Sequence, residues 1–161
     1  MRIDLTRHEF FICEYIGSIR RKNAMTHNTD RQISNQDPFQ QDIDGFVGEY
    51  IVAKYFNLMP DFSVNPKKNP IDLISRTGKS LDVKTTRNKD GKVYVTDYHK
   101  NNPCDFYILV VIDDKGGDIA GWIDQETLFS IAKTITKKDK SGKDHTSYVI
   151  EQEQLSKIKD Y

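Results

Sequence analysis

Cysteine is scarce in this sequence and long apolar runs are absent. Cys13 and Cys104 lie far apart, and neither belongs to a Cys-x-x-Cys pair. This argues against a cysteine-built zinc site and for a reducing compartment. No apolar run reaches the roughly 18 residues that a membrane span needs, and the first residues lack the pattern of a secretory signal. We therefore expect an intracellular, cytoplasmic protein with no membrane partner.

The motifs of several common enzyme classes are also missing. The four histidines show no His-x-His or His-x-x-x-His spacing, so a histidine-built zinc site is not expected. The sequence has neither a Gly-x-Ser-x-Gly elbow nor a Gly-x-x-x-x-Gly-Lys-Ser/Thr phosphate loop. Its 24 basic and 24 acidic residues give a net charge of zero. Because strong nucleic-acid binders are more often basic overall, such binding here requires a local basic stripe.

The chain of 161 residues suits one domain. We divide it into an N-terminal helix and polar arm (residues 1–41), a central core (42–133) and a polar loop with a last strand or turn (134–161). The pattern predicts an α/β fold with a mixed central sheet. Helices are expected over residues 1–22, 42–58 and 124–133. Strands are expected over residues 71–75, 81–86, 93–96, 106–112, 118–123 and 148–150.

The ends of these segments carry recognisable signals. Thr6 and Glu9 have the spacing of a capping box at the start of the first helix. The apolar stripe expected to face the core from that helix consists of Phe11, Ile12, Tyr15, Ile16 and Ile19. The run over residues 106–112 is almost entirely apolar, as expected for a strand covered on both faces. Residues 136–147 are rich in Lys, Asp and Gly, which predicts an exposed loop.

A hairpin over residues 71–84 carries the most informative polar pattern. A loop over residues 76–78 would place Gly78 at the left-handed position that such loops favour. That register sets Asp72 opposite Asp82, and Lys84 then shares their face. The other face is apolar, formed by Ile71, Leu73, Leu81 and Val83.

Two carboxylates side by side repel each other unless a cation lies nearby. Oxygen ligands alone select a hard ion such as Mg²⁺ or Mn²⁺. A lysine on the same face can contact a phosphate or the attacking water. Asp72, Asp82 and Lys84 are therefore candidate catalytic residues for phosphodiester hydrolysis. The competing interpretation is a solvated hairpin face on which polar residues alternate for ordinary reasons.

Glu49 favours the catalytic interpretation. On a helix it shares a face with Val52, Ala53 and Phe56, the face that should pack on the sheet. A charged glutamate there needs a partner, because its desolvation is costly. A metal ion or its bound water is one such partner, and a salt bridge at the helix edge is the alternative.

This combination resembles the PD-(D/E)XK nuclease superfamily, which includes restriction endonucleases and Holliday-junction resolvases. Glu49 matches the acid of the first core helix, Asp72 the first strand acid, and Asp82-Val83-Lys84 the (D/E)xK triplet. The resemblance covers about residues 42–133 and implies a restriction-endonuclease-like αβββαβ core flanked by helices.

The resemblance implies an endonuclease that hydrolyses DNA with Mg²⁺ or Mn²⁺. Asp72 and Asp82 would be direct metal ligands, joined by the carbonyl of Val83. Glu49 would bind the metal directly or through water, and Lys84 would handle the attacking water.

A polar and basic stretch follows the triplet. The resemblance implies DNA contacts at Thr85, Thr86 and Arg87. Lys89, Lys92 and Tyr94, with His99 and Lys100 beyond them, extend this stretch and are expected to contact phosphates or stack on bases.

Two alternatives remain open at this point. One is a non-catalytic nucleic-acid-binding or assembly module that retains the fold, and the other is a nuclease acting on RNA. A homodimer formed through the N-terminal helix is a candidate assembly.

Overall fold

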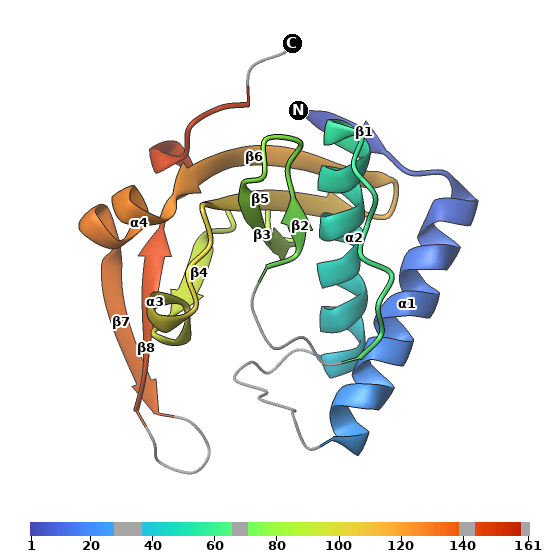
Figure 1. Ribbon diagram of the computed structural model, residues 1–161, viewed down its shortest axis with the longest axis horizontal. Helices are drawn as coiled ribbons and strands as arrows, with labels where there is room; N and C mark the ends of the chain where they lie inside the picture. Colours follow the sequence, from blue (N-terminus) through green and yellow to red (C-terminus); the bar gives the residue numbers. More distant parts are fainter. Residues whose placement is uncertain (28–36, 66–70, 139–143, 159–161) are drawn as a thin grey trace.

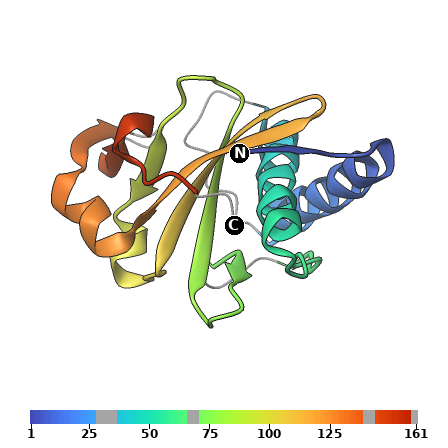
Figure 2. The same ribbon diagram turned by 90° about the horizontal axis from the view of Figure 1, so that it is seen from above.

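A five-stranded mixed sheet lies between two different layers (Figure 1). Helices α1 and α2 cover one face, and a three-stranded sheet with α4 covers the other (Figures 1 and 2). The computed structural model describes residues 1–27, 37–65, 71–138 and 144–158. In this part of the chain no helix is both long enough and apolar enough to span a bilayer.

The large sheet has the order β1-β6-β5-β3-β2, in which β3 and β5 are parallel and the other pairs antiparallel. The small sheet has the order β4-β8-β7. The strands are β1 (Arg2–Asp4), β2 (Leu73–Ile74), β3 (Ser80–Thr86), β4 (Val93–Thr96), β5 (Phe106–Asp113), β6 (Gly116–Asp124), β7 (Lys133–Lys138) and β8 (Asp144–Ile150). The helices are α1 (Arg7–Thr26), α2 (Pro38–Phe56), α3 (Tyr98–Asn101), α4 (Gln125–Ile131) and a short 3₁₀ turn (Gln152–Gln154). The expected mixed α/β class is confirmed.

Burial on both faces explains the apolar sequence of β5. Ile108 and Val110 pack in the core beneath α1 and α2. Tyr107 and Leu109 point the other way, into the core shared with β4, β8 and α4. Successive residues of a strand face opposite sides, so a strand between two layers must be apolar at almost every position.

The hairpin has the register expected from its sequence. Leu73 pairs with Leu81 across β2 and β3. Gly78 has φ +79, and the Ser75 amide donates to the Lys79 carbonyl at 2.8 Å across the loop. The loop over residues 76–78 is therefore confirmed, with its glycine in the left-handed conformation.

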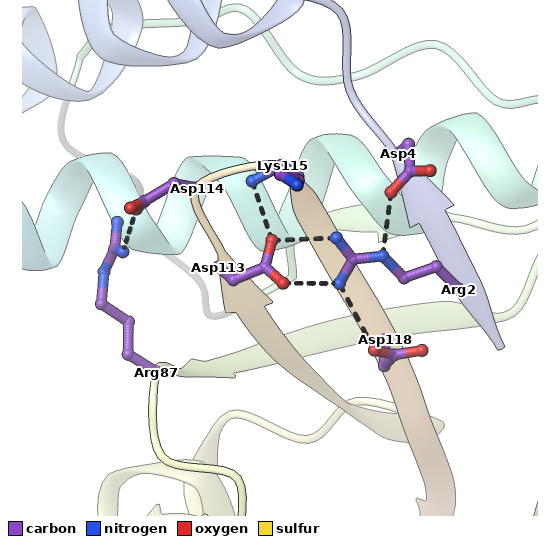
Figure 3. Close-up of polar contacts among 7 residues, drawn as sticks. All are labelled: Arg2, Asp4, Arg87, Asp113, Asp114, Lys115 and Asp118. Carbon is purple, nitrogen blue, oxygen red and sulfur yellow. Dashed lines mark hydrogen bonds and ion pairs between the residues drawn. The ribbon is translucent and has the colours of Figure 1, made fainter.

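The N-terminus begins differently from the expectation. Residues 2–4 form β1 on the edge of the large sheet, and α1 starts only at Arg7. The expected capping box at Thr6 is present at the N-terminus of α1. Two guanidinium nitrogens of Arg2 each donate to one carboxylate oxygen of Asp113 at 2.9 Å, which holds β1 in place (Figure 3). Arg2 also contacts Asp4 and Asp118.

The apolar stripe expected for the first helix is wrong in most of its members. Ile16 is buried, but Phe11 is 67% exposed and Tyr15 59% exposed. The helix instead packs through Cys13, Ile16, Gly17 and Arg21. The spacing of apolar residues predicts the wrong buried face of α1, because the aromatic residues lie beside the face that contacts α2.

The expected exposed loop over residues 136–147 is also wrong in the part that the structure describes. β7 and β8 pair there in an antiparallel ladder, from Lys133 opposite Val149 to Lys138 opposite Asp144. Residues 139–143 lie outside the described residues. Residues 133–137 of β7 are all exposed and, apart from Ile135, polar, so their composition resembles that of a loop.

α1 and α2 approach each other closely at Gly17. A Cβ added at this glycine would lie 2.6 Å from the Cα of Ile43 in α2. Gly45, also inside α2, has no atom within 4 Å of the equivalent position. One helical glycine is therefore required by packing, whereas the other is not.

We expect opposite effects from the same substitution at these two glycines. Gly17→Ala should lower the free energy of unfolding by about 2 kcal/mol, because the methyl group meets helix backbone. Gly45→Ala should raise it by up to about 1 kcal/mol through helix propensity. Urea denaturation measures both, and equal effects at the two positions would contradict the helix crossing described here.

Candidate active site

β3 carries Asp82 and Lys84 on the face that meets the small sheet. In the parallel register with β5, Asp82 is paired with Tyr107 and Lys84 with Leu109. The Asp82 residue is only 1% exposed. Its Oδ1 lies 2.6 Å from Lys84 Nζ, and its Oδ2 lies 2.9 Å from the same nitrogen. The two residues of the triplet therefore form a buried ion pair.

His99 is the second partner of this carboxylate. Its Nε2 lies 3.1 Å from Asp82 Oδ2, and its Nδ1 lies 3.2 Å from Thr96 Oγ1. A neutral ring protonated at Nε2 satisfies both contacts, since it donates to Asp82 and accepts from the threonine hydroxyl. The ring also meets Tyr107 edge to face, with centroids 6.1 Å apart.

These contacts determine the ionisation of Asp82. Burial raises the pKa of its carboxyl group, but the charge of Lys84 and the hydrogen bond from His99 outweigh burial. The pKa of Asp82 consequently lies below its ordinary value, and the group is ionised at neutral pH.

Asp72 lies across the hairpin from this pair. Its Oδ2 accepts a hydrogen bond from the Val83 amide at 2.8 Å, and its own amide donates to the Leu81 carbonyl. The amide and carbonyl of one strand residue point to the same edge, so the Val83 carbonyl faces the edge where Asp72 lies. Three oxygen donors expected from the sequence, from Asp72, Asp82 and Val83, thus belong to adjoining positions of one hairpin.

Glu49 belongs to α2, which covers the opposite face of the large sheet. It is 7% exposed, and Arg20 of α1 binds both of its oxygens at 2.8 and 2.9 Å. The neighbouring Gly48 packs against the side chain of Thr85, which follows Lys84 and points toward α2. Of the two interpretations of Glu49 given above, a metal ligand or a salt bridge at the helix edge, these contacts match the salt bridge, which is largely buried.

The three acids do not gather into one ligand set. Within the part of the chain that the structure describes, no three His, Cys, Asp or Glu side chains are placed to hold a metal ion together. Asp72, Asp82 and the Val83 carbonyl are the hard oxygen donors that suit Mg²⁺ or Mn²⁺. The chemical type of these three donors fits such an ion, but the Glu49 carboxylate is not grouped with them.

The stretch expected to contact DNA is partly engaged by acidic groups. Arg87 binds Asp44 through two nitrogens at 2.8 Å. Arg87 also binds Asp114 at 3.0 Å (Figure 3). Lys92 pairs with Glu151 at 2.8 Å.

The remaining members of that stretch differ in exposure. Lys89 is exposed, and Tyr94 is 52% exposed. The Thr86 hydroxyl accepts from the Asn88 amide. The Thr85 hydroxyl is buried and, among the described residues, has no hydrogen-bond partner. Lys89 and Tyr94 are therefore two members of this set that are exposed to a partner.

The chain matches the model of a protein family. The model of DUF5843, a family of unknown function, matches residues 1–116, which is most of the chain. The chain belongs to this family. No curated protein matches it significantly. The part shared with DUF5843 runs from β1 through β5 and includes Asp72, Asp82, Lys84 and His99, so the family description leaves the role of this site open.

The contacts of two residues in this DUF5843 protein, His99 and Arg20, are not predicted by the sequence. The sequence predicts His99 only as part of a basic stretch, and it gives no signal that singles out Arg20. His99 reaches Asp82 because α3, a helix of four residues, follows β4 and folds back onto β3. A histidine 17 positions after an aspartate carries no spacing signal, so only the tertiary structure reveals the contact.

We expect the buried carboxylate to make stability depend on pH. Since the pKa of Asp82 is lowered on folding, its contribution is complete above the ordinary value of 3.8. That contribution is lost as the pH falls through the folded-state pKa. Asp82→Asn should cost about 3 kcal/mol of unfolding free energy at about pH 6, because Lys84 loses its buried partner. The difference from the wild type should shrink toward about pH 3.

Urea denaturation across this pH range measures the difference. Asp118→Asn is the control, because Asp118 is an exposed partner of Arg2. That variant should change stability by less than about 0.5 kcal/mol at either pH. A gap between Asp82→Asn and the wild type that stays constant with pH would show that the carboxylate is not ionised as described.

Proposed function

We propose that this DUF5843 protein is a metal-dependent phosphodiester hydrolase of the PD-(D/E)XK type, acting on DNA through Asp72, Asp82 and Lys84. The observation that carries the proposal is the buried Asp82–Lys84 pair, with the Asp72 carboxylate hydrogen-bonded to the amide of the residue between them. A buried ionisable group with a perturbed pKa and a specific charged partner, such as Asp82, is typical of functional sites.

The order of elements also supports the proposal. From α2 to β5 the chain forms helix, three strands, helix and strand, which is the αβββαβ order expected of a restriction-endonuclease-like core. The Asp82 strand β3 pairs antiparallel with β2 and parallel with β5. β4 departs from this arrangement, because it pairs with β8 in the small sheet.

In the proposed mechanism each residue has a separate task. Asp72, Asp82 and the Val83 carbonyl would hold Mg²⁺ or Mn²⁺, which when bound lowers the pKa of water and screens charge on the phosphate. Lys84 would orient the attacking water with one N–H while another stays on Asp82. His99, held by Thr96, keeps the Asp82 carboxylate oriented.

The other residues expected to act at this site, Glu49, Lys89 and Tyr94, have roles outside the metal-binding group in this proposal. Glu49 is bound by Arg20 of α1, so we propose for it a supporting role in holding α2 against α1. Lys89 and Tyr94 are proposed as DNA contacts, because both are exposed beyond the end of β3.

A non-catalytic nucleic-acid-binding or assembly module is the second candidate. What favours it is that Lys84 and Arg20 already neutralise Asp82 and Glu49 within the chain. A pair of this kind is a stable structural element that needs no ion. The same experiment separates the two candidates.

Purified protein incubated with supercoiled plasmid, branched DNA and RNA, with and without Mg²⁺ or Mn²⁺, tests the proposal. We expect metal-dependent cleavage of DNA, and Asp82→Asn and Lys84→Ala should each lower the cleavage rate by at least about 100-fold. Lys79→Ala is the matched control, because Lys79 lies on the same hairpin but its ion pair is with Asp105, which has no role in the proposed mechanism. That variant should retain full activity.

The outcomes separate the candidates clearly. Cleavage of RNA alone would assign the enzyme to the other nucleic acid. Nucleic-acid binding without cleavage, unchanged by Asp82→Asn, would support the module. Equal cleavage by the wild type and a folded Asp82→Asn variant would disprove the catalytic role of this aspartate.

A further inference from the structure

A pocket lies on the α2 side of the large sheet, beyond the end of that helix. α2 ends at Phe56, and Asn57 follows in the left-handed conformation with φ 51. The helix layer therefore stops before it covers the whole sheet. The pocket at this end has a volume of about 400 Å³, and its floor is formed by Leu81, Phe106, Ile108 and Trp122.

The chemistry of this floor is unusual for an open sheet surface. A sheet face in contact with water normally carries polar residues. Here β3, β5 and β6 contribute aliphatic and aromatic side chains, and Phe106 and Trp122 meet edge to face with centroids 5.1 Å apart. An apolar pocket of about 300–1,000 Å³ with a few polar groups at its edge is typical of a small-molecule site.

The rim of the pocket supplies a positive charge. Lys157 lines it from the C-terminal side, and its Nζ donates to the neutral Ala120 carbonyl at 3.2 Å. Lys79 lines it from the hairpin loop, but Lys79 also pairs with Asp105 at 2.8 Å. The hydroxyls of Ser75 and Thr77 complete the polar edge.

We propose that this pocket binds a small organic anion with an apolar, ring-sized body. The body would lie on the floor against Trp122 and Phe106, and the acidic group would face Lys157. The pocket is distinct from the proposed catalytic site, because Leu81 and Asp82 are successive residues of β3 and face opposite sides of the sheet. Its test is accordingly independent of nuclease activity.

The fluorescence of Trp122 can report binding in the pocket, because Trp122 is the single tryptophan of the chain. Titration of the full chain with anilinonaphthalene sulfonate should change the emission of Trp122 in a saturable manner, with one probe bound per chain. Phenylnaphthylamine, which is the same molecule without its sulfonate, measures the apolar contribution alone.

Lys157→Glu tests the charge, and it should leave the fold intact because Lys157 is exposed. We expect this variant to bind the sulfonate probe about tenfold more weakly and the neutral probe within about twofold of the wild type. Lys157→Arg should restore the sulfonate affinity. Phe11→Ser is the control for adventitious binding, because Phe11 is an exposed aromatic residue of α1 that does not line the pocket.

Three results would overturn the proposal. The first is sulfonate binding that leaves Trp122 emission unchanged or that Phe11→Ser abolishes. The second is equal sulfonate affinity in the wild type and Lys157→Glu. The third is at least tenfold tighter binding by a chain truncated after Ile158, which would assign the pocket to the chain's own last residues.

Discussion

Burial of β5 on both faces is the constraint on which the rest of the structure depends. Its alternate side chains enter two separate cores, one beneath α1 and α2 and one against β4, β8 and α4. Such a strand is stable only when a layer covers each face, because the apolar side chains of both faces must leave water. The two layers therefore assemble around β5, and β3, which pairs with it in parallel, is enclosed with it.

The enclosure of β3 has an electrostatic consequence. A carboxylate at the position of Asp82 cannot remain charged in an apolar core without compensation. Lys84 on the same face and His99 from α3 provide that compensation, and the pKa of Asp82 is lowered as a result. The same arrangement suits a preorganised reaction centre, in which positions and charges are set before a substrate arrives.

The alternation of side chains along β3 gives its two faces different chemistry. Asp82 and Lys84 face the small sheet, whereas Leu81, Val83 and Thr85 face α2. Glu49 belongs to the second face and is neutralised there by Arg20. The pocket over Leu81 also belongs to that face, at the point where α2 ends. One strand thus contributes to a buried polar cluster on one side and to an apolar pocket on the other.

The sequence by itself determined the features that depend on neighbours along the chain. These include the Thr6 capping box, the hairpin register with Gly78 in its loop, the two-faced apolar run of β5 and the shared face of Asp82 and Lys84. Local hydrogen bonds and strand alternation suffice to determine such features.

Only the tertiary structure decided which face of α1 is buried, that residues 133–138 pair with 144–150, and that Glu49 meets Arg20 while His99 meets Asp82. Each of these depends on contacts between segments distant along the chain. Such contacts are selected by how whole layers pack, and a local pattern of residues carries no information about that choice.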